Sequence, residues 1–263
     1  MKTPIVTLTT DWGDQGFFVG MVKGVLYSMI EGVQVVDIAH HIEPFNVMAA
    51  TFVVKHACTG FPPGTIHIID VASSHTDEHP FVVVKAHGQY YICADNGLPA
   101  MAFGNDIEDV SRIPVNEKGI YNFAAYNLFS LVAQKLLAGA SMRDIGPQHT
   151  ALMQRTLPGY IQQGDYYRIY VHYIDSYGNA YLGMSYREFE ELRQGREFSL
   201  MVRDQEIHEI MASYYQQHTY NDPRRRMRLT ISATGLLELA VKESCLTRLL
   251  GLKMNESVLL RFK

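Results

Sequence analysis

Cysteine, tryptophan and net charge are all scarce in this chain of 263 residues. The three cysteines, Cys58, Cys93 and Cys245, lie far apart in apolar surroundings, which argues against a disulfide framework or a zinc site and predicts buried, unreactive thiols. The formal net charge of -4 gives no bulk attraction to nucleic acid or to an anionic membrane. We therefore expect no nucleic-acid partner, no membrane partner and no metal.

The sequence also lacks any stretch near the roughly 20 apolar residues that a membrane-spanning helix needs. Its first four residues lead straight into a predicted strand, without the apolar segment of a signal peptide. A cytoplasmic location is the expectation that follows. With 47% hydrophobic and 19% charged residues, the composition is that of a globular protein with one large or two modest domains.

The pattern of apolar residues changes partway along the chain. Strand-like runs alternate with helical patterns up to about residue 150, which is typical of a largely parallel sheet flanked by helices. Turn-forming residues then become dense, and short β-rich runs follow. The sequence thus predicts an α/β domain over residues 1–156, a linker over 157–165 and a smaller, all-β, barrel-like domain over 166–263. Strands are expected at 5–10, 33–38, 65–70, 81–86, 90–94, 166–174, 197–202, 228–232, 236–241 and 257–262, and helices at 18–30, 47–58 and 127–138.

The most informative motif is Thr9-Thr10-Asp11-Trp12-Gly13, in which an apolar strand ends in a carboxylate and a glycine. Ligands of open α/β sheets bind outside the carboxyl ends of the strands, and a carboxylate there can accept two hydrogen bonds from a ribose diol. Asp11 is therefore a candidate ligand-binding residue. The alternative is that it only caps the following helix or turn.

Four more polar clusters interrupt the apolar runs at places where side chains could converge on a ligand. Each cluster alone is compatible with turn chemistry, because Asn-Gly and Gly-Asn are common turn pairs. A separate group of arginines at 224–226 and 228 is expected to be a solvated turn, with a phosphate-binding patch as the minor alternative. The four clusters are 37–46, Asp70, 94–98 and 175–179.

Taken in order along the chain, these segments resemble the family of S-adenosyl-L-methionine hydroxide adenosyltransferases, which also contains the fluorinating and chlorinating enzymes. The resemblance covers nearly the whole chain and is most specific over residues 35–50, with a His-x-Ile-x-Pro-Phe-Asn-Val pattern. It implies a hydrolase that attacks C5′ of S-adenosylmethionine with water, gives adenosine and L-methionine, and needs no cofactor. It also implies a homotrimer whose adenosyl sites lie between the first domain of one subunit and the second domain of the next.

Carried over residue by residue, the resemblance implies a set of ligand contacts. Asp11 would bind the ribose hydroxyls, and Phe45 would line the sugar and methionine portions. Asp175 would pair with the methionine ammonium, and Asn179 would read the adenine edge. Plain core packing remains open for Phe45, and a left-handed turn role remains open for Asn179. The implied substrate-binding residues are Asp11, Phe45, Asn46, Asn96, Asp175 and Asn179, and the implied catalytic residue is Asp70.

Two of the three catalytic positions of the family differ in this chain. Asp77 or Glu78 stands near the place of an arginine, and Ala124 stands where the family has a histidine. The added carboxylates are expected to favour the protonated form of the catalytic acid and to disfavour hydroxide nearby. His75 and His79 could compensate, or they could be ordinary loop histidines. Two hypotheses remain: a hydrolase with a reduced catalytic set, and a protein that binds adenosine or S-adenosylmethionine with weak or no turnover.

Overall fold

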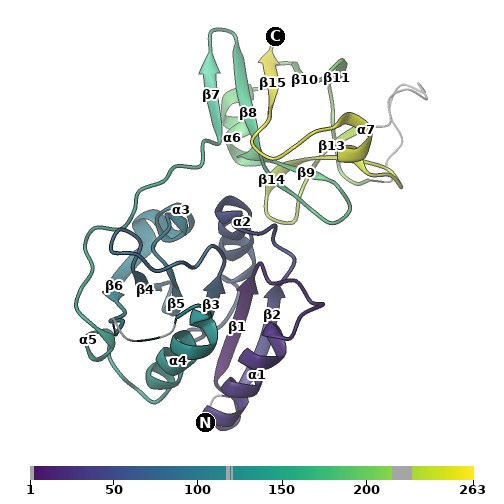
Figure 1. The fold of residues 1–263 in the computed structure, drawn as a ribbon. Coiled ribbons are helices and arrows are strands. Elements are labelled where there is room, and N and C mark those ends of the chain that lie inside the picture. Colours follow the sequence, from purple (N-terminus) through teal and green to yellow (C-terminus); the bar gives the residue numbers. More distant parts are fainter. Residues whose placement is uncertain (1–2, 117–118, 120, 215–226) are drawn as a thin grey trace. The chain divides into compact units, whose positions relative to one another are not determined.

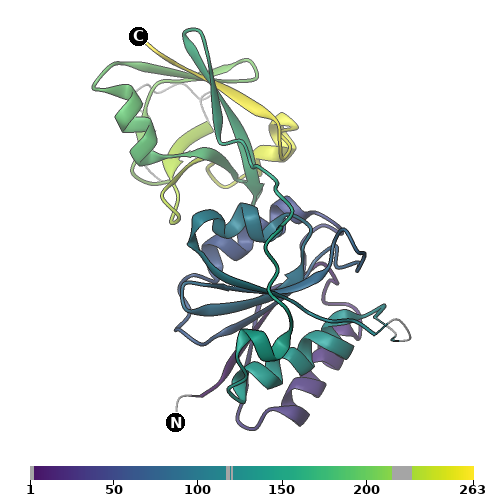
Figure 2. The same cartoon turned by 90° about the vertical axis from the view of Figure 1, so that its left-hand side faces the viewer.

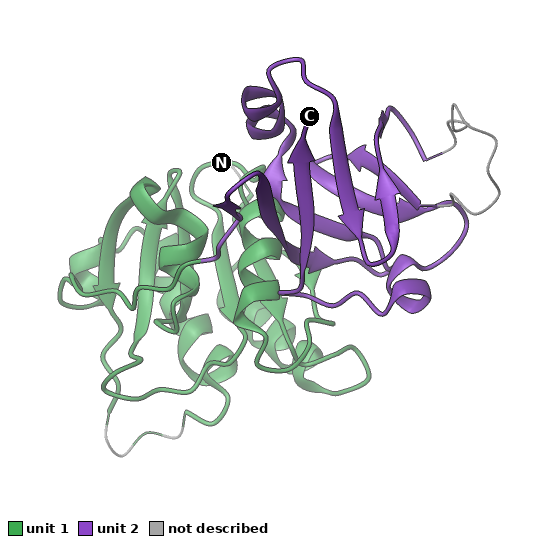
Figure 3. Ribbon diagram, turned by 90° about the horizontal axis from the view of Figure 1, so that it is seen from above, with its two compact units in different colours: residues 1–156 green, residues 157–263 purple. Residues whose placement is uncertain are grey.

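The computed structural model covers the whole chain and describes residues 3–116, 119, 121–214 and 227–263. The chain divides into two compact units, residues 1–156 and 157–263 (Figure 3). The predicted arginine turn at 224–226 lies outside the described residues. No helix in the described ranges has the length and apolar character that crossing a membrane requires.

A six-stranded sheet with the order β2-β1-β3-β5-β4-β6 forms the centre of the first unit. The pairs β2-β1, β1-β3 and β3-β5 are parallel, whereas β4 runs antiparallel to both β5 and β6. The sheet is therefore mixed, because the predicted hairpin over 81–94 is present and its short turn can only join antiparallel strands. The strands are β1 (Ile5–Thr10), β2 (Gln34–Ala39), β3 (Ile66–Asp70), β4 (Phe81–Ala86), β5 (Gln89–Ala94) and β6 (Ile107–Arg112).

Helices cover both faces of this sheet, with α1 and α4 on one face and α2 and α3 on the other (Figures 1 and 2). Helix α1 buries Val22 and Leu26 completely against the sheet, because these residues recur at helical spacing. The three predicted helices are confirmed, although the third begins with a π-helical turn, η2. The helices of this unit are α1 (Phe18–Met29), α2 (Val47–Ala57), α3 (Leu98–Phe103), η1 (Gly104–Asp106), η2 (Ala125–Phe129), α4 (Ser130–Leu137) and α5 (Met142–Ile145).

The second unit is a single curled sheet that resembles half a barrel (Figure 1). Its strand order is β11-β10-β15-β8-β9-β14-β13-β12, and β7 pairs with β8. Two helices also belong to this unit, so it is not all-β as predicted, and β7 occupies part of the predicted linker because its backbone pairs with β8. The elements are β7 (Tyr160–Gln163), β8 (Tyr166–Ile174), β9 (Ala180–Ser185), α6 (Tyr186–Arg193), β10 (Phe198–Val202), β11 (Gln205–Ile207), β12 (Ile210–Met211), β13 (Met227–Ile231), β14 (Leu236–Val241), α7 (Leu246–Leu250) and β15 (Ser257–Phe262).

Candidate functional site

Two carboxylates meet at the carboxyl edge of the first sheet. Strands β1 and β3 are parallel neighbours, and Thr10 pairs in register with Asp70. Asp11 follows directly after β1, so its side chain and that of Asp70 come from adjacent strand ends. The negative charge of Asp11 helps to raise the pKa of Asp70, as expected for two neighbouring carboxylates. This sheet edge is where open α/β sheets bind their ligands.

The Asp11 carboxylate ties two loops together. Its Oδ2 accepts hydrogen bonds from the backbone N–H of Phe45, at 2.9 Å, and of Ala72, at 3.4 Å. Both donors have positive φ, 66° for Phe45 and 50° for Ala72, a strained conformation for residues with a side chain. Helix α1 has no side-chain cap, so Asp11 does not cap it. Within the described residues Oδ1 accepts no hydrogen bond and is available to a ligand.

The Phe45 side chain is 77% exposed, which contradicts the alternative of core packing. The positive φ of Phe45 costs folding free energy, and strained residues of this kind cluster at ligand-binding sites. The exposed ring of Phe45 therefore favours a binding role over a packing role. Its neighbour Asn46 is the N-cap of α2, where Oδ1 accepts the backbone N–H of Ala49 at 3.0 Å and Nδ2 donates to Glu43 at 3.0 Å. Asn46 therefore fixes the start of α2 behind the Phe45 loop.

Asn96 also serves the shape of this edge. It is 9% exposed, and its Nδ2 donates to the backbone carbonyl of Val71 at 3.1 Å. Its Oδ1 accepts the backbone N–H of Leu98 at 3.2 Å. Asn96 thus anchors the loop after β3 to the start of α3, and both of these contacts are structural.

Among the described carboxyl groups of the first unit, Asp70 has the most perturbed pKa. Its side chain is only 7% exposed, and burial, assisted by the charge of Asp11, raises its pKa to about 6. The backbone N–H of Ala125, at the start of η2, donates to it and acts in the opposite direction. The nearby Ser73 hydroxyl also lowers the pKa of Asp70. This hydroxyl is buried, and it lies outside full hydrogen-bonding geometry with every described residue.

The loop carboxylates were expected to favour a protonated Asp70. However, Asp77 is 99% exposed and pairs with Arg112 at 3.3 Å. An exposed, paired carboxylate has little influence on a buried group. Burial of Asp70 itself is the main cause, so the direction was right and the physical origin was not.

The raised pKa of Asp70 makes a prediction about stability. A carboxyl whose pKa rises from 3.8 to about 6 on folding stabilises the fold only while it is protonated, so its contribution is complete below about pH 4 and is lost as the pH rises through 6. The D70N variant should therefore be more stable than the wild type by about 2–3 kcal/mol near pH 8, and equally stable near pH 4. Urea unfolding at both pH values measures this; equal stability near pH 8 would contradict it.

The loop after β3 also contains a buried histidine nitrogen. Nε2 of His75 is buried without a hydrogen-bond partner in the described ranges, and its ring lies 5.2 Å from that of Phe81. Burial and the charge of Arg112 lower the pKa of His75, which favours the neutral ring. His79 instead places Nδ1 3.2 Å from the carbonyl oxygen of Asp95. Of the two loop histidines, only His75 has an unpartnered buried nitrogen.

Position 124 carries no polar chemistry. Ala124 is 2% exposed and packs in the core cluster that includes Phe81 and Phe129. A methyl group in this core can neither donate nor accept a proton. The sequence prediction that this position lacks a catalytic group therefore agrees with its surroundings.

In the second unit, Asp175 and Asn179 form one tight turn between β8 and β9. Asp175 Oδ1 accepts the backbone N–H groups of Tyr177 and Asn179, each at 2.9 Å. Its Oδ2 accepts the side-chain amide of Asn179 at 3.3 Å. Gly178 has a φ of 81°, and a Cβ there would lie 2.3 Å from Cys245 Sγ, so only glycine fits. The turn thereby places a carboxylate and an amide side by side.

Glu238, on β14, lies next to this turn and was not among the predicted site residues. It is 1% exposed, and the Tyr214 hydroxyl donates to its Oε1 at 2.6 Å. Burial and the charge of Asp175 raise its pKa, whereas hydrogen bonds from Tyr214 and Asn179 lower it. A single acidic residue inside the apolar run Leu236–Val241 was the signal that the sequence offered.

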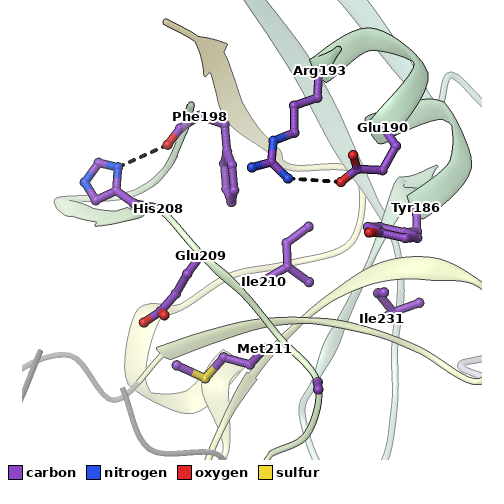
Figure 4. A pocket seen from close by; sticks show the side chains of 10 residues that line it. Tyr186, Glu190, Arg193, Phe198, His208, Glu209, Ile210, Met211 and Ile231 are labelled. Atoms are coloured by element: carbon purple, nitrogen blue, oxygen red, sulfur yellow. Dashed lines mark hydrogen bonds and ion pairs between the residues drawn. The ribbon is translucent and has the colours of Figure 1, made fainter. Parts of the chain in front are cut away.

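A cavity of about 420 Å³ in the second unit contains none of these residues (Figure 4). It lies among α6, β12 and β13, where Arg193 pairs with Glu190 at 3.2 Å and His208 Nδ1 lies 3.2 Å from the Phe198 carbonyl oxygen. Its charged groups are thus already used within the fold. The predicted site residues instead form two groups, one at the sheet edge of the first unit and one around the 175–179 turn of the second.

Two family models match successive parts of the chain. The model of the SAM hydroxide adenosyltransferase N-terminal domain matches residues 6–146, and that of the SAM hydroxide adenosyltransferase C-terminal domain matches residues 169–259. Two proteins named (R)-S-adenosyl-L-methionine hydrolase are similar to this chain. The protein from Salinispora tropica is 26% identical over 258 residues, covering 95% of this chain and 94% of its own length. The protein from Methanocaldococcus jannaschii is 32% identical over 99 residues, covering 36% and 37%.

Two crystal structures share the fold. An uncharacterized conserved protein from Thermotoga maritima matches with a TM-score of 0.85 and 21% identity, over 98% of this chain and 99% of that one. A conserved hypothetical protein from Thermus thermophilus matches with a TM-score of 0.75 and 22% identity, over 99% and 100%. At this identity the two matches establish the arrangement of the chain and nothing about its chemistry.

Proposed function

The chain belongs to the SAM hydroxide adenosyltransferase family, and from that premise we propose that it hydrolyses S-adenosylmethionine to adenosine and L-methionine. The observation that carries the proposal is the buried carboxyl of Asp70 beside Asp11, at the register-paired ends of β1 and β3. One carboxylate with a raised pKa and one with a free oxygen are suited to two tasks, moving a proton and binding a diol.

The reaction needs a positioned water more than an acid. The oxygen of water attacks C5′, the C5′–S bond breaks, and its electron pair goes to sulfur. Methionine therefore leaves as a neutral thioether and requires no protonation. The proton lost by the attacking water passes to the Asp70 carboxylate and then to solvent. Because Asp70 is buried, bulk water has little access to it. Alignment of the one attacking water with the C5′–S bond then supplies much of the rate.

The other residues hold the substrate in this proposal. Asp11 Oδ1 accepts hydrogen bonds from the ribose hydroxyls, and the exposed Phe45 ring covers the apolar face of the sugar. Asp175 pairs with the ammonium of the methionine portion, and Asn179 contacts the adenine edge. S-adenosylmethionine and water are the only small molecules that the proposed reaction requires, and no cofactor takes part.

Turnover is expected to be slow. Loss of one positioned acid–base group commonly costs about 10²–10⁴-fold in rate, and Ala124 provides no such group in this chain. His75 is the residue of the altered loop whose buried Nε2 could supply part of the missing function. The same departures support a second candidate, a protein that binds adenosine or S-adenosylmethionine with little or no turnover.

The pH dependence of turnover separates these candidates. Asp70 acts as a base only when ionised, so the rate of adenosine release should rise with pH and reach half of its maximum near a pH of 6. Chromatography of adenosine and methionine at several pH values between about 5 and 8 measures this rate. The two products should be released in equal amounts. Release no faster than in a protein-free blank would leave the binding protein as the function.

The two groups of residues that the proposal assigns to one ligand lie in different units of the chain. Asp11 and Asp70 belong to the first unit, whereas Asp175 and Asn179 belong to the second. We propose that the chain forms a homotrimer in which the first unit of one subunit and the second unit of the next complete each site. A cytoplasmic location remains part of the proposal.

A further inference from the structure

The last residues of the first unit are anchored to the carboxyl end of β5. Asp95, directly after β5, is 1% exposed, and each of its carboxylate oxygens accepts the backbone N–H of Met153 at 3.0 Å. Its Oδ2 also lies 3.1 Å from Nε2 of His149. A buried carboxylate is costly without such partners, and here both come from one short segment. Asp95 therefore fixes this segment against the end of the strand.

Arg155 follows in the same segment, and its side chain lies along Gly97. A Cβ at Gly97 would lie 2.5 Å from Cδ of Arg155 and 2.6 Å from its Cγ, so the arginine occupies the space that a side chain at position 97 would need. Gly97 also has a φ of 92°, a conformation that favours glycine. Because Cδ carries the guanidinium group, the positive charge of Arg155 lies close to the end of β5.

The same sheet edge carries the two carboxylates of the candidate site. Strand β5 is the parallel neighbour of β3, which ends at Asp70. Asn96, bonded to Gly97, donates from Nδ2 to the carbonyl oxygen of Ala72 at 3.4 Å. The backbone N–H of Ala72 in turn donates to Asp11 at 3.4 Å. A continuous set of contacts thus joins the glycine beneath the arginine side chain to the proposed ribose carboxylate.

The guanidinium group of Arg155 is free to bind a ligand. The side chain is exposed, and within the part of the chain that the structure describes it has no hydrogen-bond or ion-pair partner. S-adenosylmethionine carries an ammonium and a carboxylate on the same carbon. The proposed contacts pair the ammonium with Asp175 and leave the carboxylate without a partner.

We propose that Arg155 is a substrate-binding residue, which pairs with the carboxylate of the methionine portion and makes the site select adenosyl ligands with a complete amino acid. A guanidinium group can donate two parallel hydrogen bonds to a carboxylate, a geometry that a lysine does not offer. The inference rests on the proposed function, because it takes the sheet edge at Asp11 and Asp70 as the adenosyl site. It adds a cation to a set of proposed contacts that is otherwise acidic or neutral.

Two ligands that differ only in the carboxylate test this role: S-adenosylhomocysteine and its decarboxylated form. Both lack the sulfonium leaving group, so calorimetry can measure binding without turnover. The wild type should bind S-adenosylhomocysteine about ten- to a hundredfold more tightly than the decarboxylated form, and R155Q should remove most of this preference. R155K keeps the charge without the planar fork and should retain more of the preference than R155Q. A purely structural role would weaken both ligands alike and leave the preference unchanged.

The matched control is R187Q, which removes the same charge from an 88% exposed arginine that pairs with Glu191 on α6. It should leave the preference at the wild-type value, and an equal loss in R187Q would attribute the preference to overall charge and overturn the role of Arg155. Because Arg155 is itself exposed, R155Q should fold as the wild type does.

The outcomes separate the two proposals. A preference that persists in R155Q, or a wild type that binds the two ligands equally well, overturns the role of Arg155 and leaves the proposed function intact, because both ligands still report adenosyl binding. A wild type that binds neither of these ligands nor S-adenosylmethionine overturns both proposals.

Discussion

Replacing Asp70 by asparagine is expected to lower the rate of adenosine release about 10²–10⁴-fold at a pH above 6, while the affinity for S-adenosylmethionine changes little. Asparagine keeps the size of the side chain and can still accept the N–H of Ala125, but it cannot accept a proton from water. Single-turnover kinetics gives the chemical rate, and calorimetry gives the affinity. The same variant is expected to be more stable than the wild type, so a loss of rate would not reflect unfolding.

A matched variant separates the buried carboxylate from charge in general. D77N removes a negative charge from the same loop, at a side chain that is 99% exposed, and should leave the rate nearly unchanged. Undiminished adenosine release by D70N would show that Asp70 is structural, and His75 would become the next residue to test. A large loss in D77N would show that the loop carboxylate matters in a way that its exposure does not explain.

Replacing Asp11 by alanine is expected to weaken adenosine binding by about 1.5–3 kcal/mol. The variant loses the hydrogen bonds that Oδ1 would make to the ribose, and it also releases the backbone N–H groups of Phe45 and Ala72. Calorimetry with adenosine and with 2′,3′-dideoxyadenosine separates the two effects. The ribose contact accounts for the part of the loss that is seen only with adenosine.

The control for D11A is D14A, because Asp14 is 64% exposed and pairs with His41 in the same part of the chain. Equal adenosine affinity in D11A and the wild type would remove Asp11 from the site.

D11A also tests the assembly when it is mixed with N179A. In a trimer with shared sites, roughly one quarter of the sites in random mixtures would combine an intact Asp11 with an intact Asn179, and binding would partly return. No return on mixing would place both residues in a site of one subunit.

The sequence predicted much of the fold because its long elements have clear periodicity. The strand at Ile5–Thr10 and the hairpin over 81–94 are present where expected. Some of the elements that were missed, such as α5 (Met142–Ile145) and β12 (Ile210–Met211), are too short for a period to be recognised, whereas β9 (Ala180–Ser185) and α6 (Tyr186–Arg193) were missed despite their length. The antiparallel β4-β5 pair follows from the predicted hairpin, whereas the pairing of β4 with β6 depends on which strands become neighbours, and no local pattern encodes this.

The candidate site was predictable only in part. Strand ends marked Asp11 and Asp70, because a carboxylate after an apolar run is visible in the sequence. The N-cap contact of Asn46 with Ala49 is local, whereas the contact of Asn96 with Val71 depends on a backbone group that lies nearby only after folding. The raised pKa of Asp70 has the same origin, since its main cause is burial. Glu238 was missed because one charged residue in a strand is typical of a solvent-facing position. Its burial becomes visible only in the folded sheet.

The most direct test of the account is hydrolysis of S-adenosylmethionine in water enriched in oxygen-18, with mass spectrometry of both products. Attack of water at C5′ places one labelled oxygen in the 5′-hydroxyl of adenosine and none in methionine, and D70N should form this product far more slowly. Labelled adenosine and unlabelled methionine, released together and dependent on Asp70, are the result that we predict. No adenosine above a protein-free blank, or adenosine without the label, would contradict the proposed reaction.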